Sequence, residues 1–196
     1  MHRRHALQLL VAACAAAALP VQATTDLAAI HFDNDANVAG VRLQRNGAGV
    51  RTKLFFQIYA MGLYLADKKT TTAEVLAAPG PRRVLITMLR DVSIEDFGKA
   101  FTDGLNANTS KEERIRILSQ TMQFGTVFGQ VQTLKKGDQM QFDWLPGEGT
   151  QCYLNGKKTG ELMPDLAFYN AVLRIWLGDR PADHALKLAL LGLAAK

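Results

Sequence analysis

Residues 54–65, LFFQIYAMGLYL, are the segment that most limits what this chain can fold into. Large apolar and aromatic side chains occupy both odd and even positions, and Gln57 is the only strongly polar residue. A strand of this composition is buried on both faces, because a solvated face would bring in alternating polar residues. We therefore expect a central strand of a sheet, with Gly62 at a point where backbone or ligand comes close.

Arg51 stands at the head of this apolar run. It has two interpretations that the residues alone leave open. It is either the ordinary exposed start of a core strand, or the cation nearest to an apolar cavity. In the second case its planar guanidinium, which stays charged, would donate two parallel hydrogen bonds to an anion.

The first 23 residues are expected to be a secretory signal peptide rather than part of the fold. Basic and histidine residues at positions 2–5 precede an apolar stretch, and residues 21–23 fit a small-residue cleavage site. The domain is then residues 24–196. Cleavage near Ala23 would leave the protein in the periplasm or outside the cell.

A second interpretation of the N-terminus depends on Cys14. Residues 11–14, VAAC, resemble a lipoprotein box, and a lipid on Cys14 would anchor the protein to a membrane. With the signal peptide removed, Cys152 would be the only cysteine, so no internal disulfide could form. We expect Cys152 to be a small buried hydrophobe.

Charge and motif content exclude several classes of function. Removing residues 1–23 takes away Arg3 and Arg4 and no acid, which lowers the net charge from +5 to +3. This charge is spread through the chain, so no nucleic acid partner is expected. His31 and His184 have no ligand-type neighbours at metal-site spacing, and no phosphate-binding glycine loop or nucleophile elbow occurs. We expect neither a metal nor a cofactor, and the oligomeric state stays open.

The order of the predicted elements indicates one α+β domain, a largely antiparallel β-sheet with helices packed on one face. Before the central strand we expect a strand over 38–45 that turns at Asn46-Gly47, a strong hairpin signal. Ser93 and Ser110 begin two successive helices, the second with Glu113 as a capping box. The other predicted elements are helices over 70–78, 164–177 and 182–193 and strands over 84–89, 139–145 and 151–154.

Three segments resemble the chalcone isomerase superfamily. They are GAGVR followed by FFQIYAMGLYL, then residues 82–105, and then residues 164–181. The likeness covers about residues 38–193 and is greatest to secreted bacterial chalcone isomerase-like proteins. It implies the open-faced sandwich of that family for residues 24–196.

The resemblance also implies a role for Arg51. In the plant enzymes of the family, a phenolate oxygen of a chalcone attacks a conjugated double bond, and an arginine at the position of Arg51 handles the oxyanion. Fatty-acid-binding relatives use the same arginine for a carboxylate. The two activities therefore share one residue and differ in the others.

The other catalytic positions differ from the enzyme pattern. The catalytic threonine of the family falls at Tyr59, and its tyrosine and asparagine fall at Phe97 and Gly104. A phenylalanine cannot donate a hydrogen bond to a substrate carbonyl. Losing one donor to a developing oxyanion costs roughly 10²–10³ in rate. The resemblance therefore favours a protein that binds a ligand of this kind over one that transforms it.

Our leading hypothesis is a secreted, non-catalytic protein that binds a small apolar anion, such as a fatty acid or an aromatic acid. Apolar walls with few polar anchors are typical of such sites. The catalytic residues stay unknown under this hypothesis. The residues expected to form the binding site are Arg51, Phe55, Phe56, Tyr59, Phe97 and Phe101.

Two alternatives stay open. An isomerase or intramolecular lyase acting on chalcone-like enones would need a polar partner for Arg51, for which the sequence offers Tyr59, Thr102 or Thr159. A structural or partner-binding module with a vestigial cleft would expose part of the late helix, at Tyr169, Trp176 and Leu177. Pairing of Arg51 with Asp91 or Asp96 would favour this last hypothesis.

Overall fold

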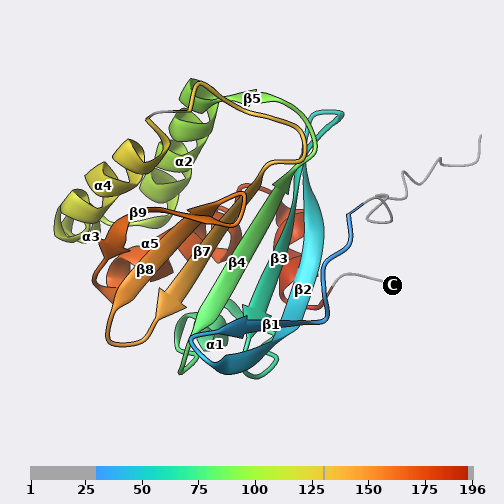
Figure 1. The fold of residues 1–196 in the computed structure, drawn as a ribbon, viewed down its shortest axis with the longest axis vertical. Helices are drawn as coiled ribbons and strands as arrows, with labels where there is room; N and C mark the ends of the chain where they lie inside the picture. The colour runs from blue at the N-terminus through green and yellow to red at the C-terminus, as the bar shows by residue number, and fades with distance from the viewer. Residues whose placement is uncertain (1–29, 130, 194–196) are drawn as a thin grey trace, which may run out of the picture.

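A seven-stranded antiparallel sheet forms the centre of the molecule in the computed structural model, which describes residues 30–129 and 131–193 (Figure 1). The strand order is β1-β2-β3-β4-β7-β8-β9, and β5 and β6 form a separate two-stranded ladder. No helix in these ranges is long and apolar enough to cross a membrane. The strands are β1 (Asp35–Val38), β2 (Val41–Lys53), β3 (Phe56–Leu65), β4 (Arg82–Met88), β5 (Val92–Ser93), β6 (Thr133–Leu134), β7 (Gln139–Leu145), β8 (Gly149–Leu154) and β9 (Lys157–Met163).

Six helices pack on this sheet, and the predicted α+β class with a largely antiparallel sheet is confirmed. Helix α5 contacts β8, α6 contacts β2, and α2 packs on α5. Figure 1 shows α5 and α6 behind the sheet and α2 to the left of it, with the other face of the sheet toward the viewer. The helices are α1 (Thr72–Leu76), α2 (Ile94–Asn108), α3 (Lys111–Arg116), α4 (Leu118–Phe128), α5 (Leu166–Leu177) and α6 (His184–Leu190).

Strand β3 is central and buried on both faces, as its sequence predicts. Its side chains Met61 and Leu63 belong to the main core beneath the helices. Ala60 packs on the other face with Phe32, from the segment that leads into β1. A Cβ atom at Gly62 would lie 2.9 Å from the Phe32 ring. The glycine therefore admits an aromatic ring of the same chain, rather than a backbone segment or a ligand.

The start of the central strand differs from the prediction. Leu54 and Phe55 form the turn between β2 and β3, and Leu54 has a φ of 56°, in the left-handed region. Arg51 therefore lies at the end of β2, where it pairs across the ladder with Tyr59. An apolar run does not show where a strand begins when the turn before it is also apolar.

The predicted hairpin at Asn46-Gly47 is wrong. Strand β2 continues through both residues, with a bulge between Arg45 and Gly47. The buried Asn46 amide donates hydrogen bonds to the carbonyls of Lys69 (2.9 Å) and Leu190 (2.7 Å). The Asn-Gly pair thus serves a bulge under α6, where a turn would leave these carbonyls without their partner.

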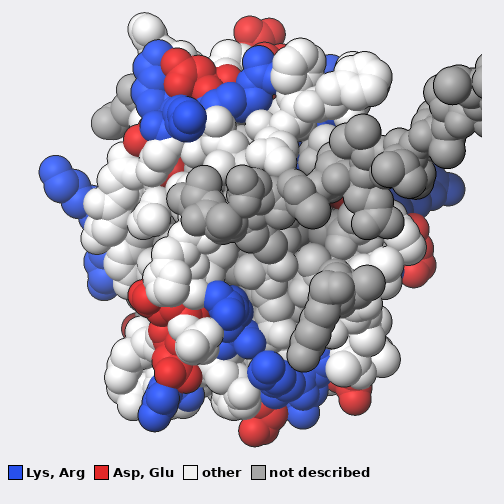
Figure 2. Space-filling model, turned by 90° about the vertical axis from the view of Figure 1, so that its right-hand side faces the viewer, with Lys and Arg blue, Asp and Glu red and all other residues white. Residues whose placement is uncertain are grey.

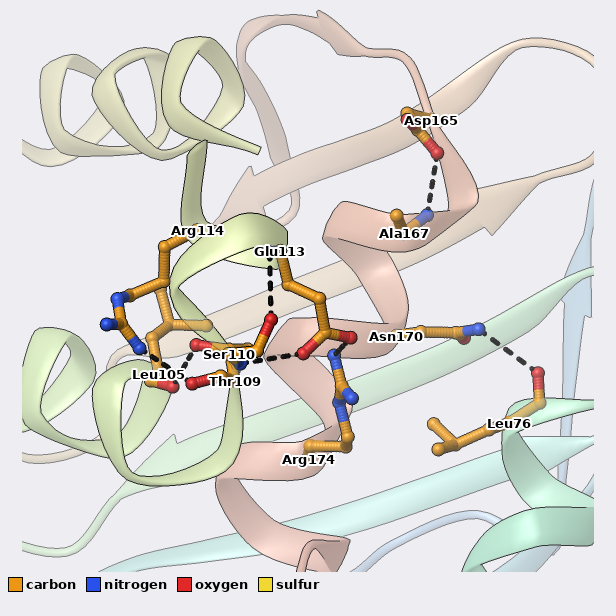
Figure 3. Close-up of polar contacts among 10 residues, drawn as sticks. All are labelled: Leu76, Leu105, Thr109, Ser110, Glu113, Arg114, Asp165, Ala167, Asn170 and Arg174. Atoms are coloured by element: carbon orange, nitrogen blue, oxygen red, sulfur yellow. Dashed lines mark hydrogen bonds and ion pairs between the residues drawn. The ribbon is translucent and has the colours of Figure 1, made fainter. Parts of the chain in front are cut away.

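The predicted helix caps at Ser93 and Ser110 are confirmed. The Ser110 hydroxyl accepts from the Glu113 amide (3.2 Å), and the Glu113 carboxylate accepts from the Ser110 amide (2.8 Å). Figure 3 shows that Glu113 also accepts from the Arg174 guanidinium of α5 (2.8 Å), which ties the start of α3 to α5. The helix predicted from Ser110 is interrupted at Ile117, whose side chain is buried between α3 and α4.

Strand β9 is missing from the sequence prediction, which ended the strands of the sheet at residue 154. It pairs with β8 alone and lies at the edge of the sheet, so its largely exposed side chains show no apolar alternation.

Cys152 on β8 is buried, and this burial raises the pKa of its thiol to about 12. The expectation that Cys152 is a small buried hydrophobe is confirmed.

Candidate functional site

A cavity of about 510 Å³ opens where β3, β4 and β5 meet α2 and the connection between α5 and α6. In Figure 1 this region lies at the upper end of the sheet, below β5. Its apolar wall includes Ile58, Met88 and Val92, from the sheet side, and Phe97 and Ala100, from α2. The size falls within the range of about 300–1,000 Å³ that is usual for small-ligand sites.

Arg51 lines this cavity from the end of β2. Its guanidinium carbon lies 5.6 Å from the centre of the Tyr59 ring, which is directly across the ladder. The Nε atom is buried and has no hydrogen-bond partner among the described residues. Because desolvated polar groups are normally hydrogen-bonded, the Nε–H group of Arg51 is available to donate a hydrogen bond to a bound ligand.

No carboxylate of residues 30–129 and 131–193 forms an ion pair with Arg51. Asp91 instead pairs with Lys135 at 2.9 Å, and Asp96 accepts a hydrogen bond from the Ser93 hydroxyl. The pairing that would have favoured a vestigial cleft therefore does not occur. Arg51 therefore lines the cavity with no carboxylate of the described residues within ion-pair distance.

Tyr59 places a phenol beside Arg51. Its side chain is only 4% exposed, and its oxygen accepts a hydrogen bond from the Trp176 indole (2.7 Å). Burial raises the pKa of Tyr59, while the charge of Arg51 and the hydrogen bond from Trp176 partly oppose this rise. The phenol therefore keeps its proton at neutral pH, and it can donate a hydrogen bond but cannot act as a base.

Helix α2 presents no polar side chain at Phe97 and Gly104, the two positions at which the resemblance would imply a tyrosine and an asparagine. Phe97 lines the cavity, and Phe101 lies behind it in the core, stacked on Phe124 at 4.2 Å. Gly104 also lines the cavity, and a Cβ atom there would lie 2.8 Å from a methyl group of Ile175. The bare glycine lets α2 approach α5 closely, so no side chain reaches into the cavity from this position.

Phe55 and Phe56 do not line the cavity, contrary to the sequence expectation. The Phe55 side chain is 94% exposed at the β2–β3 turn, and Phe56 is 55% exposed. Arg90 lies over the Phe56 ring at 4.6 Å. The reason is the turn at Leu54, which points these side chains away from the sheet and into solvent.

The residues that motivated the two alternatives lie elsewhere. Thr102 is exposed on α2, and Thr159 lies on the edge strand β9, so neither lines the cavity with Arg51. Tyr169, Trp176 and Leu177 are at most 4% exposed. The idea that the late helix exposes these three side chains is wrong, because they pack between α5 and the sheet core.

The sequence interpretation missed Trp176 and the basic residues around the cavity. Trp176 fixes the Tyr59 hydroxyl, and no local pattern links two residues so far apart in the chain. Five basic and three acidic side chains line the cavity. Among these eight, only Lys99 and Asp103 form an ion pair with each other. The four other basic side chains are Arg51, Lys53, Arg90 and Arg180. Within the described ranges, no group of three histidine, cysteine or acidic residues could hold a metal ion.

Comparisons with known proteins agree with this architecture. A family model described as chalcone isomerase-like matches residues 24–192. The crystal structure of a fatty-acid binding protein from Arabidopsis thaliana is similar in fold, with a TM-score of 0.64 at 12% sequence identity. That match covers 82% of this chain and 90% of the Arabidopsis chain. No curated protein matches the sequence.

Proposed function

Because the chain belongs to the chalcone isomerase-like family, we propose that it is a non-catalytic member that binds a small apolar anion through Arg51. The ligand class is a fatty acid or an aromatic acid. One observation carries the proposal. An arginine with a buried, unpartnered Nε atom lines a cavity with one apolar wall and a charged rim, and it has no ion-pair partner among the described residues.

The chemistry of the cavity favours an anion with an apolar body. A carboxylate is planar and accepts two parallel hydrogen bonds from a guanidinium, which a neutral ligand cannot match. Tyr59 can donate a further hydrogen bond beside Arg51, since its oxygen already accepts from Trp176. Ile58, Met88 and Phe97 would then contact the apolar part of the ligand. The similar fold of the Arabidopsis fatty-acid binding protein supports the same ligand class.

The absence of catalysis follows from the wall of α2. Phe97 has no polar atom, and Gly104 has no side chain, so neither can donate to a carbonyl or order a water. The neutral phenol of Tyr59 cannot abstract a proton at physiological pH, because burial raises its pKa. Arg51 would therefore hold an anion without partners that could transform it.

Export of the protein is a further part of the proposal, and it rests on the sequence. The expected signal peptide and the alternative lipoprotein box at Cys14 both lie outside the described residues. We propose cleavage near Ala23 and release into the periplasm or the medium. Residues 24–196 would then form the mature domain, and the family model covers residues 24–192 of it.

Native mass spectrometry of the gently purified protein tests the ligand. We expect the wild-type protein to carry an added mass of a few hundred daltons that dissociates as an anion, and the Arg51→Ala variant to lose it. Arg42→Ala is the matched control, because Arg42 is an exposed arginine of the same strand that pairs with Asp35 away from the cavity. An adduct retained equally by Arg51→Ala would contradict the role of Arg51.

The isomerase alternative keeps one observation in its favour, the Tyr59 phenol beside Arg51. A hydroxychalcone loses its visible absorbance when its ring closes, so turnover can be followed directly. We expect no turnover above the uncatalysed rate. Turnover that Arg51→Ala abolishes would replace the binding proposal with an isomerase.

A further inference from the structure

The turn between β2 and β3 exposes three large apolar side chains in succession. Leu54 is 81% exposed, Phe55 94% and Phe56 55%. The turn lies at the upper end of the sheet in Figure 1, beyond the cavity. Single exposed apolar residues are common on protein surfaces. A group of three adjacent ones at a protruding turn is instead typical of a surface that contacts a membrane or another protein.

The backbone holds these side chains outward at a cost. The φ of 56° at Leu54 lies in the left-handed region, which a leucine rarely adopts because its Cβ atom crowds the backbone there. A glycine would take this conformation without that cost. The turn thus carries an apolar side chain where folding alone would favour glycine, as is found where backbone strain serves a function.

Basic residues surround this turn. The strand ends and connections at the same end of the sheet, residues 53–55, 89–91, 135–138 and 155–158, hold six basic and two acidic side chains. Counted with strand ends in the same way, the connections at the opposite end, residues 39–42, 66–83, 146–148 and 164–165, hold five basic and four acidic side chains. Figure 2 shows basic side chains, interrupted by acidic ones, along the upper edge of the molecule. The end of the sheet that carries the apolar turn therefore has the larger net positive charge, +4 (six basic minus two acidic) against +1 (five basic minus four acidic).

We propose that the β2–β3 turn docks this protein on a lipid bilayer with anionic headgroups. Phe55 and Leu54 insert among the acyl chains near the headgroups, and Lys53, Arg90 and Lys136 face the lipid phosphates. Apolar side chains flanked by lysine and arginine are the combination that binds a membrane interface. A second copy of the chain would instead bring two basic sheet ends together, which repel.

The docking surface adjoins the mouth of the cavity. Arg51, Lys53 and Arg90 line the cavity, and Lys53 directly precedes the turn. Docking would therefore place the cavity entrance at the membrane surface. The inference does not depend on the proposed function, because it rests on the exposed turn and the charges around it rather than on any bound ligand.

Tryptophan fluorescence of a Phe55→Trp variant tests the insertion directly. We expect its emission to shift to shorter wavelength on addition of vesicles of phosphatidylglycerol and phosphatidylcholine, and not with phosphatidylcholine alone. Met122→Trp is the matched control, because Met122 is 66% exposed on α4, away from the turn. No shift for Phe55→Trp, or an equal shift for Met122→Trp, would overturn the proposal.

Vesicle partitioning measures the contribution of each side chain. The full-length chain is used throughout, so that any contribution of its N-terminal residues is common to all variants. Phe55→Ser should lower partitioning about tenfold or more, since a buried phenylalanine contributes at least that much. Lys53→Gln should lower it about fivefold and reduce its sensitivity to salt.

Leu54→Gly separates docking from folding. This variant should bind vesicles more weakly while its melting temperature stays equal or rises, because glycine removes the strain at φ 56°. Light scattering of wild type and Phe55→Ser without vesicles adds a last check. A dimer that Phe55→Ser dissociates would show that a second copy, and not a bilayer, covers the turn.

Discussion

Replacing Arg51 with glutamine is expected to weaken the binding of dodecanoate about 100-fold, with little change in the binding of dodecanol. Hydrogen bonds between charged groups contribute roughly 1.5–3 kcal/mol each, and every 1.4 kcal/mol is about tenfold in affinity. Glutamine keeps a polar side chain of similar reach but loses the charge and the paired donors of the guanidinium. The alcohol shares the apolar chain and lacks the carboxylate, so it should sense only the apolar wall.

Isothermal titration of both ligands against both proteins measures this difference. Arg180→Gln is the matched control, because Arg180 lines the same cavity from the connection after α5 and is not beside Tyr59. It should change the affinity for dodecanoate much less than Arg51→Gln does. Equal losses for the alcohol and the acid in Arg51→Gln would mean that the substitution damages the cavity as a whole, and the anchor role would be wrong.

Replacing Gly47 with alanine is expected to destabilise the fold by about 3 kcal/mol or more, which lowers the melting temperature of a domain of this size by about 10 °C. A Cβ atom at this position would lie 2.1 Å from the carbonyl oxygen of Ala189 and 2.6 Å from that of Leu190. Both are backbone atoms of the α6 region, and they cannot rotate away as a side chain can. The bulge or the helix must shift, and the hydrogen bond from Asn46 to Leu190 would be lost with it.

Gly98→Ala is the matched control for thermal unfolding. Gly98 lies within α2, and a Cβ atom there meets nothing within 4 Å. The control should gain roughly 0.5–1 kcal/mol, since alanine favours the helix. If Gly47→Ala unfolds at the wild-type temperature, the close approach of α6 to β2 is not a constraint on this fold.

The Gly47 prediction also shows where sequence reasoning failed. Asn-Gly flanked by apolar residues predicts a two-residue hairpin, in which glycine provides a positive φ. In the structure the pair lies inside β2, and the bulge is defined by α6, which is more than 130 residues later in the chain. A local pattern gives the conformations a residue permits, and a distant contact selects among them.

The part of the candidate site that could be predicted is the part that short sequence motifs identify. The resemblance led to Arg51, Tyr59 and Phe97, and the structure brings all three to one cavity. The sequence analysis also placed Phe55 and Phe56 in this cavity, which is wrong. An apolar run has the same sequence pattern whether its first residues are buried or form an exposed turn. Trp176 was named only as part of a late helix that one alternative would expose, since only the folded chain brings it to the Tyr59 hydroxyl.

The sequence by itself determined the class of fold, the central position of β3 and most helix starts, because apolar periodicity and capping residues act over a few positions along the chain. The tertiary structure alone decided that Arg51 has no ion-pair partner among the described residues, that Gly104 brings α2 against α5, and that the Leu54 turn leaves three apolar side chains in solvent. These properties depend on which distant groups meet in space. Chain-local preferences carry no information about such encounters, and packing of the whole domain settles them.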